Sequence, residues 1–132
     1  MFAVSKKIEY SIALVAYLAG RPNETVSLGE ISRKLLLPYR FLGQLALPLK
    51  QAGIIVGKEG RSGGYCLGSG WEKKSIYNML EALGENKHMV ECLEDGVTCD
   101  RQTKCRFGRM WERIEARVTV ELKALKLGEI KL

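Results

Sequence analysis

A chain of 132 residues, of which 46% are hydrophobic and 27% are charged, is long enough for one domain with a sizeable core, and this composition excludes wholesale disorder. No apolar run approaches the roughly 20 residues that a membrane-spanning helix needs. Glu9 interrupts the apolar N-terminal segment and no small-residue cleavage site follows, so an amphipathic helix and a cytoplasmic protein are expected rather than a signal peptide. The net charge of +6 is concentrated in residues 1–70, which carry nine Lys and Arg against four Asp and Glu, and this half is expected to bind a polyanion.

The first two elements along the chain are expected to be helices. Apolar residues recur at helical spacing over residues 6–19, and Gly20 follows as a stop signal. Ser27 and Glu30 have the spacing of a capping box, in which a hydroxyl and a carboxylate satisfy free backbone donors at the start of a helix. A second helix is therefore predicted over residues 28–35.

A third helix and a hairpin follow. The helix is expected to begin at Pro38, whose fixed φ suits the first helical position, and to end at Gly53. Pro48 lies inside it, removes one backbone donor, and is expected to kink the helix or end it early. Residues 54–56 and 65–67 have the composition of two short strands, and the four glycines between them permit a tight, exposed turn.

Two helices joined by a short turn and followed by a hairpin are the element order of a winged helix-turn-helix, in which the helix after the turn enters the major groove of DNA. A helix-turn-helix pattern alone more often reflects ordinary packing, but its combination with the hairpin and the positive charge of this half favours DNA binding. Guanidinium and amide groups suit base edges, whereas cations and a phenol suit phosphates. The expected DNA-contacting residues are Tyr39, Arg40 and Gln44 on the third helix and Lys58 and Arg61 on the hairpin.

The second half is expected to contain a short helix over residues 75–83 and a long final helix over residues 107–127. The final helix carries an apolar stripe at helical spacing, formed by Phe107, Trp111, Ile114, Val118, Leu122 and Leu125. A stripe of this size does not stay exposed on a small soluble domain, so it is expected to mediate a homodimer. The alternative is a helix that folds back onto its own core, as short amphipathic helices usually do.

A polar, irregular segment before the final helix holds Cys92, Cys99 and Cys105, three of the four cysteines in the chain. In a reducing cytosol, clustered cysteines are more often metal ligands or redox sensors than structural disulfides. Three chemistries fit this segment: an iron–sulfur cluster, a structural zinc ion with three thiolates and one other ligand, and a cluster-free switch in which two of the cysteines oxidise to a disulfide.

Enzymatic chemistry has no support in the sequence. There is no Gly-rich phosphate loop followed by Lys and Ser or Thr, and no Ser–His–Asp set is recognisable around the single histidine, His88. A binding protein is therefore expected rather than an enzyme. A purely structural interaction module is the remaining alternative, since the final helix alone could form a dimer.

Several segments are similar to those of a known family. They are Glu9–Tyr10 in the first helix, "ISRKL" in the second, "FLGQL" in the third, "GRSGGYCLG" in the hairpin, and the three-cysteine segment before a long helix. On these residues the chain resembles, over nearly its whole length, the IscR/NsrR group of winged-helix transcription regulators, the Rrf2 family. The resemblance implies a mostly α fold with a small β-hairpin wing and a long C-terminal dimerisation helix. Within one domain, residues 1–70 would form the winged helix-turn-helix, and residues 71–132 would form a cluster-binding loop at about 88–106 and the dimerisation helix at about 107–127.

The resemblance also implies a homodimeric transcriptional regulator whose affinity for operator DNA is controlled by an iron–sulfur cluster that senses redox state, nitric oxide or cluster supply. The cluster, in a two-iron or four-iron form, would be held by the three cysteines and one non-cysteine ligand. Members that use a histidine place it three residues after the last cysteine, where this chain has Gly108. In members with a carboxylate ligand, an acidic residue on the first helix reaches the partner's cluster, and Glu9 occupies that place. Glu9 is therefore the first candidate for the fourth ligand, followed by His88 and then by Cys66.

Overall fold

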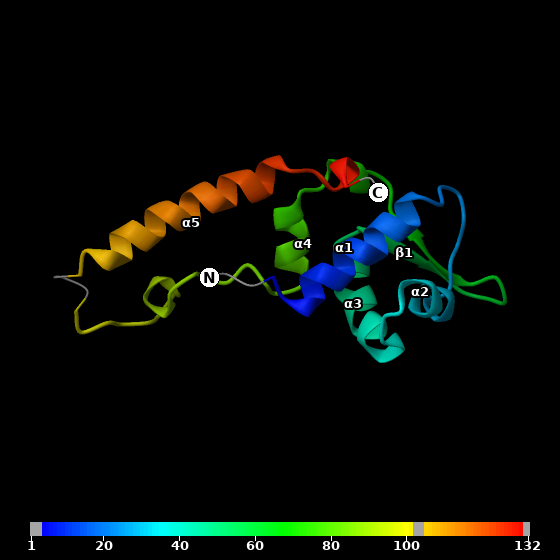
Figure 1. Ribbon diagram of the computed structural model, residues 1–132, viewed down its shortest axis with the longest axis horizontal. Helices are drawn as coiled ribbons and strands as arrows, with labels where there is room; N and C mark the ends of the chain where they lie inside the picture. Colours follow the sequence, from blue (N-terminus) through cyan, green and yellow to red (C-terminus); the bar gives the residue numbers. More distant parts are fainter. Residues whose placement is uncertain (1–3, 102–104, 131–132) are drawn as a thin grey trace.

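The structure, a computed structural model, describes residues 4–101 and 105–130. In this part of the chain, five α-helices and one antiparallel hairpin form a head and a projecting arm (Figure 1). The helices and strands are α1 Lys6–Ala19, α2 Leu28–Leu35, α3 Tyr39–Gln51, β1 Ile55–Lys58, β2 Gly64–Leu67, α4 Ile76–Ala82 and α5 Phe107–Ala124. Three short 3-10 turns are η1 Trp71–Lys73, η2 Glu91–Leu93 and η3 Leu127–Glu129. The fold expected from the sequence, a mostly α chain with a small hairpin, is confirmed.

The head consists of α1 to α4 and the hairpin, packed around one apolar core. Each helix contributes the side chains of one face, which is the arrangement that helical periodicity in the sequence predicts. The largest fully buried side chains are Leu14, Ile31, Leu42, Leu49, Ile54, Ile55, Met79 and Leu127. Among the described helices, none combines the length and apolarity that crossing a membrane would require.

The helix-turn-helix is formed by α2 and α3. The Ser27 hydroxyl caps α2 by accepting a hydrogen bond of 3.2 Å from the backbone N–H of Glu30. The Glu30 carboxylate does not complete the expected capping box; it accepts a hydrogen bond from the Tyr17 hydroxyl at 3.3 Å and so fastens α2 to α1. In the turn, Leu36 has a left-handed φ of 56°, and the Ser32 hydroxyl donates to the Leu37 carbonyl at 2.6 Å.

The two prolines of α3 have smaller effects than their sequence positions suggest. Pro38 is the N-cap, so the helix begins one residue later than expected, at Tyr39. The expected early end at Pro48 is wrong, because the helix continues to Gln51 and is closed by a hydrogen bond from Ala52 N to the Pro48 carbonyl at 3.0 Å. Burial of one whole face of α3 holds this last turn in place despite the missing donor.

The hairpin pairs Ile55 with Leu67 and Lys58 with Gly64, and each strand has four residues, one more than the composition predicted. A bridge between Val26 and Tyr65 adds the connection between α1 and α2 to its edge, with hydrogen bonds of 2.8 and 2.9 Å. At Gly64 the φ is +154°, and an added Cβ would lie 2.3 Å from the Val26 carbonyl oxygen. A side chain at this position would therefore break the bridge that attaches the wing to the head.

Gly64→Ala is expected to lower the free energy of unfolding by roughly 1–3 kcal/mol from backbone conformation, with the clash at Val26 adding to it. Thermal or urea unfolding measures the loss. Gly60→Ala is the matched control, since Gly60 has a positive φ of +109° in the same hairpin but no atom within 4 Å of the added Cβ. Equal losses in the two variants would show that the contact with Val26 is not important.

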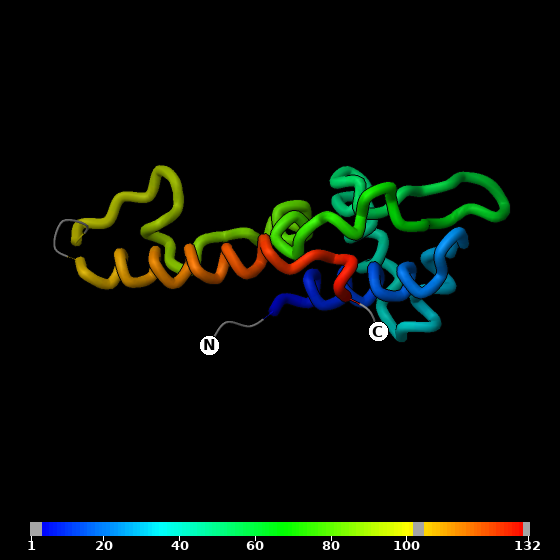
Figure 2. Tube along the Cα trace, turned by 90° about the horizontal axis from the view of Figure 1, so that it is seen from above, coloured from blue at the N-terminus to red at the C-terminus, as the bar shows by residue number. Residues whose placement is uncertain are grey.

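The arm consists of α5 and the segment between α4 and α5, which runs alongside it (Figure 2). α5 ends at Ala124, three residues earlier than expected, because the chain there leaves the helix to pair with the start of α4. Ile76 N donates to the Leu125 carbonyl at 3.0 Å, and Leu127 N donates to the Lys74 carbonyl at 2.8 Å. These hydrogen bonds join the base of the arm to the head.

Candidate DNA-binding surface and cysteine cavity

The solvent-facing side of α3 carries the residues that the sequence assigns to DNA contact. The opposite side is buried in the core through Leu42, Leu45, Ala46 and Leu49. This burial fixes the rotation of the helix and exposes Tyr39, Arg40 and Gln44. Gly43 has no side chain, and an added Cβ there would meet no atom within 4 Å, so the backbone of α3 is accessible at this position.

The hairpin presents its cations at the end of the molecule opposite the arm (Figure 2). Lys58 ends β1 and Arg61 lies in the turn, and both are exposed. Neither forms an ion pair or a side-chain hydrogen bond within the described residues, and the acidic Glu59 between them is also exposed. Both cations are therefore available to a polyanion.

The three clustered cysteines lie around one cavity at the far end of the arm. Cys92 belongs to η2, Cys99 lies in the following loop, and Cys105 immediately precedes α5. All three are half-buried and carry free thiols. The cavity has a volume of about 210 Å³, and its lining consists of Cys92, Leu93, Cys99, Cys105, Gly108, Arg109 and Glu112. The fold thus gathers three thiols that the sequence only places in order.

The thiols surround a cavity without closing on a single point. Within the described residues, no three His, Cys, Asp or Glu side chains lie close enough together to hold one metal ion. A structural zinc site requires all its ligands within about 2.0–2.3 Å of one atom. In an iron–sulfur cluster the thiolates bind different irons, so they stand further apart.

Glu9 does not line this cavity in its own chain. It lies on α1, in the head, where its carboxylate accepts a hydrogen bond from the Lys6 ammonium at 3.0 Å. This hydrogen bond and the charge of Glu9 raise the pKa of the Lys6 ammonium. Glu9 could therefore reach a cysteine cavity only in a partner chain, as the resemblance implies.

His88 is bound to a carboxylate of α5. Its Nδ1 is 2.6 Å from Oε1 of Glu115 on α5, and its backbone N–H donates to Glu94 at 3.2 Å. A carboxylate commonly orients a metal-binding imidazole in this way, yet His88 is not among the residues that line the cavity. The pair instead fastens the start of the cysteine loop to α5.

Cys66, the third candidate for the fourth ligand, lies in β2 opposite Val56. The hairpin and the cysteine loop occupy opposite ends of the molecule (Figure 1). Cys66 is therefore far from the other three cysteines.

Glu112 lines the cavity, although the sequence did not indicate it as a candidate. Its position seven residues after Cys105 was the available signal, but the sequence does not tell which face of α5 the loop covers.

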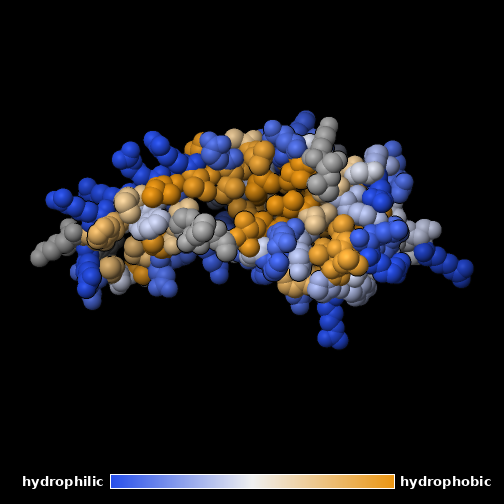
Figure 3. All heavy atoms as spheres, viewed as in Figure 1, coloured by the Kyte–Doolittle hydropathy of each residue, from blue (hydrophilic) through white to orange (hydrophobic). Residues whose placement is uncertain are grey.

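The apolar stripe of α5 stays exposed in the single chain. No residue of α5 is buried, and the exposed fractions of Ile114 and Val118 are 37% and 39%. Trp111 and Leu122 are half-buried, and Leu122 packs partly against the core of the head. Figure 3 shows hydrophobic side chains as a band along α5 that continues onto the head.

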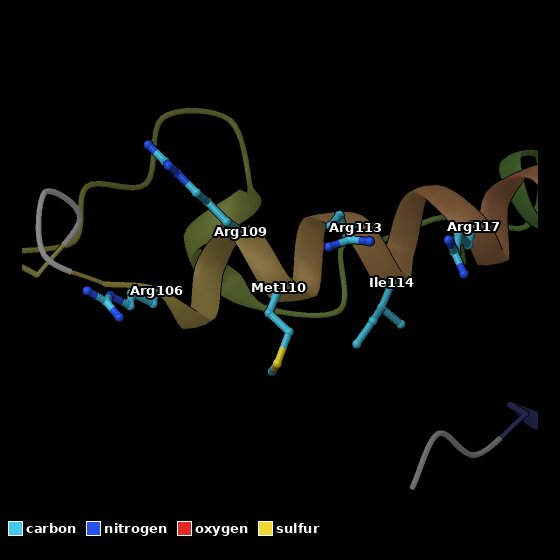
Figure 4. A pocket seen from close by; sticks show the side chains of 6 residues that line it. All are labelled: Arg106, Arg109, Met110, Arg113, Ile114 and Arg117. Atoms are coloured by element: carbon cyan, nitrogen blue, oxygen red, sulfur yellow. The ribbon is translucent and has the colours of Figure 1, made fainter.

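A row of arginines flanks this band on α5. Together with Met110 and Ile114, it lines an open pocket whose cations are Arg106, Arg109, Arg113 and Arg117 (Figure 4). Their spacing of three or four residues places them along one side of the helix. The exposed face of α5 is thus apolar with a basic border.

A family model matches residues 4–131 of this chain, and it describes Rrf2, an iron-dependent transcriptional regulator. The chain belongs to the Rrf2 family. Among Rrf2-type relatives, IscR of Cereibacter sphaeroides is 32% identical over 111 residues, which cover 82% of this chain and 71% of that protein. IscR of Vibrio vulnificus is 30% identical over 105 residues, and the chain spans about three fifths (62%) of that protein's length.

Solved structures agree with the Rrf2 assignment. The structure of CymR, the global cysteine regulator of B. subtilis, is 29% identical and matches with a TM-score of 0.73 over 96% of this chain and 94% of that one. The expected membership of the Rrf2 family and the winged-helix fold are confirmed. The Rrf2 relatives are DNA-binding transcriptional regulators, and this chain is a transcriptional regulator of the same family.

For this Rrf2 regulator, Arg40→Ala and Gln44→Ala are each expected to cost roughly 1–3 kcal/mol of DNA binding and to relax the preference at one base position. Arg61→Ala should weaken binding to all sequences and flatten its salt dependence, because a phosphate contact carries no sequence information. Binding titrations at several salt concentrations measure both effects. If the salt dependence of DNA binding is the same in Arg61→Ala as in the wild type, the assignment of the wing to the DNA-contacting surface is wrong.

Proposed function

We propose that this protein is a homodimeric regulator that binds operator DNA through α3 and the hairpin, and that an iron–sulfur cluster on Cys92, Cys99 and Cys105 controls its DNA affinity. The observation that carries the proposal is the convergence of these three cysteines on one cavity. Cys92 comes from η2, Cys99 from the following loop and Cys105 from the residues just before α5, so the cavity depends on how the arm folds.

The donor set at the cavity fits an iron–sulfur cluster. Three half-buried thiols around a cavity of about 210 Å³ are suitable ligands for several irons. Arg109 adds a positive charge at the lining, and the free N–H groups at the start of α5 add a partial one. When bound, the cluster would supply a centre that responds to oxidants and to small ligands.

A dimer through α5 gives the exposed apolar band a partner. The band includes Phe107, Ile114 and Val118, whose exposed fractions of 70%, 37% and 39% are high for large apolar side chains along one helix face. Removing such a face from water is the usual source of dimer stability. Two heads joined through their arms would then contact two half-sites on the same duplex.

The cavity is linked to α3 by contiguous contacts. His88 and Glu115 fasten the cysteine loop to α5. The end of α5 is hydrogen bonded to the start of α4 through Ile76, and α4 packs against α3. A change in the packing of the cysteine loop would therefore be transmitted through α5 and α4 to α3.

The fourth ligand remains a separate question. Glu9, on α1, would have to come from the partner chain, because in its own chain it does not line the cavity and is paired with Lys6. His88 is held by Glu115 and does not line the cavity in its own chain. Both stay predictions that ligand substitution can test.

A thiol switch without a cluster is the second candidate function. The likeness to CymR, named the global cysteine regulator of B. subtilis, favours it, as do the free thiols around one cavity. In this case two of the cysteines would form a disulfide on oxidation. Structural zinc is a third possibility for the same cysteines, although it would need the thiols to move together.

Anaerobic purification followed by absorption spectroscopy and analysis of iron, sulfide and zinc tests the proposal. An iron–sulfur protein is expected to be brown, with visible absorption and about equal amounts of iron and acid-labile sulfide. A colourless protein with stoichiometric zinc would show that the cysteines bind structural zinc instead of a cluster. A colourless, metal-free protein that forms a disulfide on oxidation would favour the thiol switch.

A further inference from the structure

We propose that Glu112 supplies the fourth, carboxylate ligand of the cysteine site from within the same chain. This inference rests on the proposed three-cysteine site. Among the described residues that line the cavity, Glu112 is the one acidic side chain. Carboxylate oxygen is an ordinary ligand of iron, although a weaker one than thiolate.

The local geometry of α5 directs Glu112 to the cysteines. Gly108 and Glu112 are one helical turn apart and therefore lie on the same face, directly after Cys105. Gly108 has no side chain, and an added Cβ there would meet no atom within 4 Å. The long Glu112 side chain can thus extend over Gly108 into the cavity.

Glu112 is also uncommitted, unlike Glu115 and Glu94 of the arm and unlike Glu9 of α1. Glu115 is bound to His88 at 2.6 Å, Glu94 accepts a hydrogen bond from the His88 backbone, and Glu9 is bound to Lys6 at 3.0 Å. Within the described residues, Glu112 forms no hydrogen bond or ion pair. Its carboxylate can bind a metal without breaking an existing contact.

Arg109 offsets the charge that this ligand set would bring together. Three thiolates and a carboxylate in one cavity repel one another, and a guanidinium on the same lining lowers that cost. Within the described residues, Arg109 forms no ion pair with an acidic side chain. It is therefore available to act as the counter-charge of the site.

An intrachain ligand has a consequence that a ligand from α1 does not have. The site would be complete within one chain. Dissociation of the carboxylate from iron would then change the position of the first turns of α5 rather than that of the partner's α1. Because oxygen binds iron less tightly than thiolate, Glu112 is the position at which a small ligand would enter.

The test compares Glu112→Ala, Glu112→Cys and Glu9→Ala with the wild type and with Glu121→Ala, an exposed control on α5 that does not line the cavity. Each dimer is loaded with iron and sulfide anaerobically. The readouts are iron loss to a chelator and the electron paramagnetic resonance spectrum. We expect Glu112→Ala to assemble the cluster but lose iron about tenfold faster or more, with a changed spectrum. Glu112→Cys should restore slow release with the spectrum of a four-thiolate site, and Glu9→Ala and Glu121→Ala should match the wild type.

Glu112→Ala behaving like Glu121→Ala while Glu9→Ala loses iron quickly would overturn the inference and assign the role to the partner's first helix. Failure of Glu112→Cys to change the spectrum would overturn it as well, since the position would then lie out of reach. A wild type that binds no iron at all contradicts the proposed cluster itself, so the two failures are distinguishable.

Discussion

Replacing Cys92, Cys99 or Cys105 with Ala, one at a time, is expected to abolish the visible absorption of the anaerobically purified protein. All three thiols line one cavity and are half-buried, so each is a required donor with no neighbouring cysteine to replace it. Two remaining thiolates in a cavity open to water do not retain a cluster. Iron and sulfide content should fall together with the absorption.

Cys66→Ala is the matched control for these variants. Cys66 is also half-buried and free, but it lies in β2, at the other end of the molecule from the cavity. The visible absorption and iron content of the Cys66→Ala variant should equal those of the wild type. If Cys66→Ala alone loses the chromophore, the hairpin takes part in metal binding and the proposed site is wrong.

Ile114→Glu and Val118→Glu are expected to convert the dimer to a monomer. Both side chains lie on the exposed apolar band of α5, and burying a carboxylate among the apolar side chains of a dimer interface costs roughly 2–5 kcal/mol. DNA affinity should fall by about a hundredfold, because the second head no longer binds as part of the same molecule. Sedimentation at micromolar concentration and binding titrations measure the two effects.

Ala116→Glu provides the control for the added charge. Ala116 is exposed on α5, half a turn or more away from Ile114 and Val118, and Glu is well tolerated in helices. This variant should remain dimeric and bind DNA normally. A wild type that sediments as a monomer at micromolar concentration would contradict the dimer through α5.

The sequence predicted the helices of the head well because their apolar periodicity and their start and stop residues agree. Ser27 and Gly53 mark the start of α2 and the end of α3 within a residue or two. Where local rules and tertiary packing compete, packing decides. Pro48 does not end α3, whose buried face holds the last turn, and α5 ends early because its C-terminal residues pair with the start of α4.

The site was predicted less completely than the fold. Three cysteines in sequence indicated the donors; they line one cavity, and their role as ligands stays a prediction. Which other side chains join them depends on the packing of the cysteine loop against α5, and no periodicity encodes it. For this reason Glu112 was missed, and the pairing of His88 with Glu115 was not foreseen.

The most direct test of the central claim is the DNA affinity of one anaerobic preparation measured with its cluster intact and again after the cluster has been removed, at constant salt. The two affinities are expected to differ by about 5- to 150-fold, which corresponds to a coupling of roughly 1–3 kcal/mol between two sites. Cys92→Ala should show the affinity of the cluster-free form under both conditions. Equal affinities for the intact and the cluster-free wild type would contradict the claim that the cysteine site controls DNA binding.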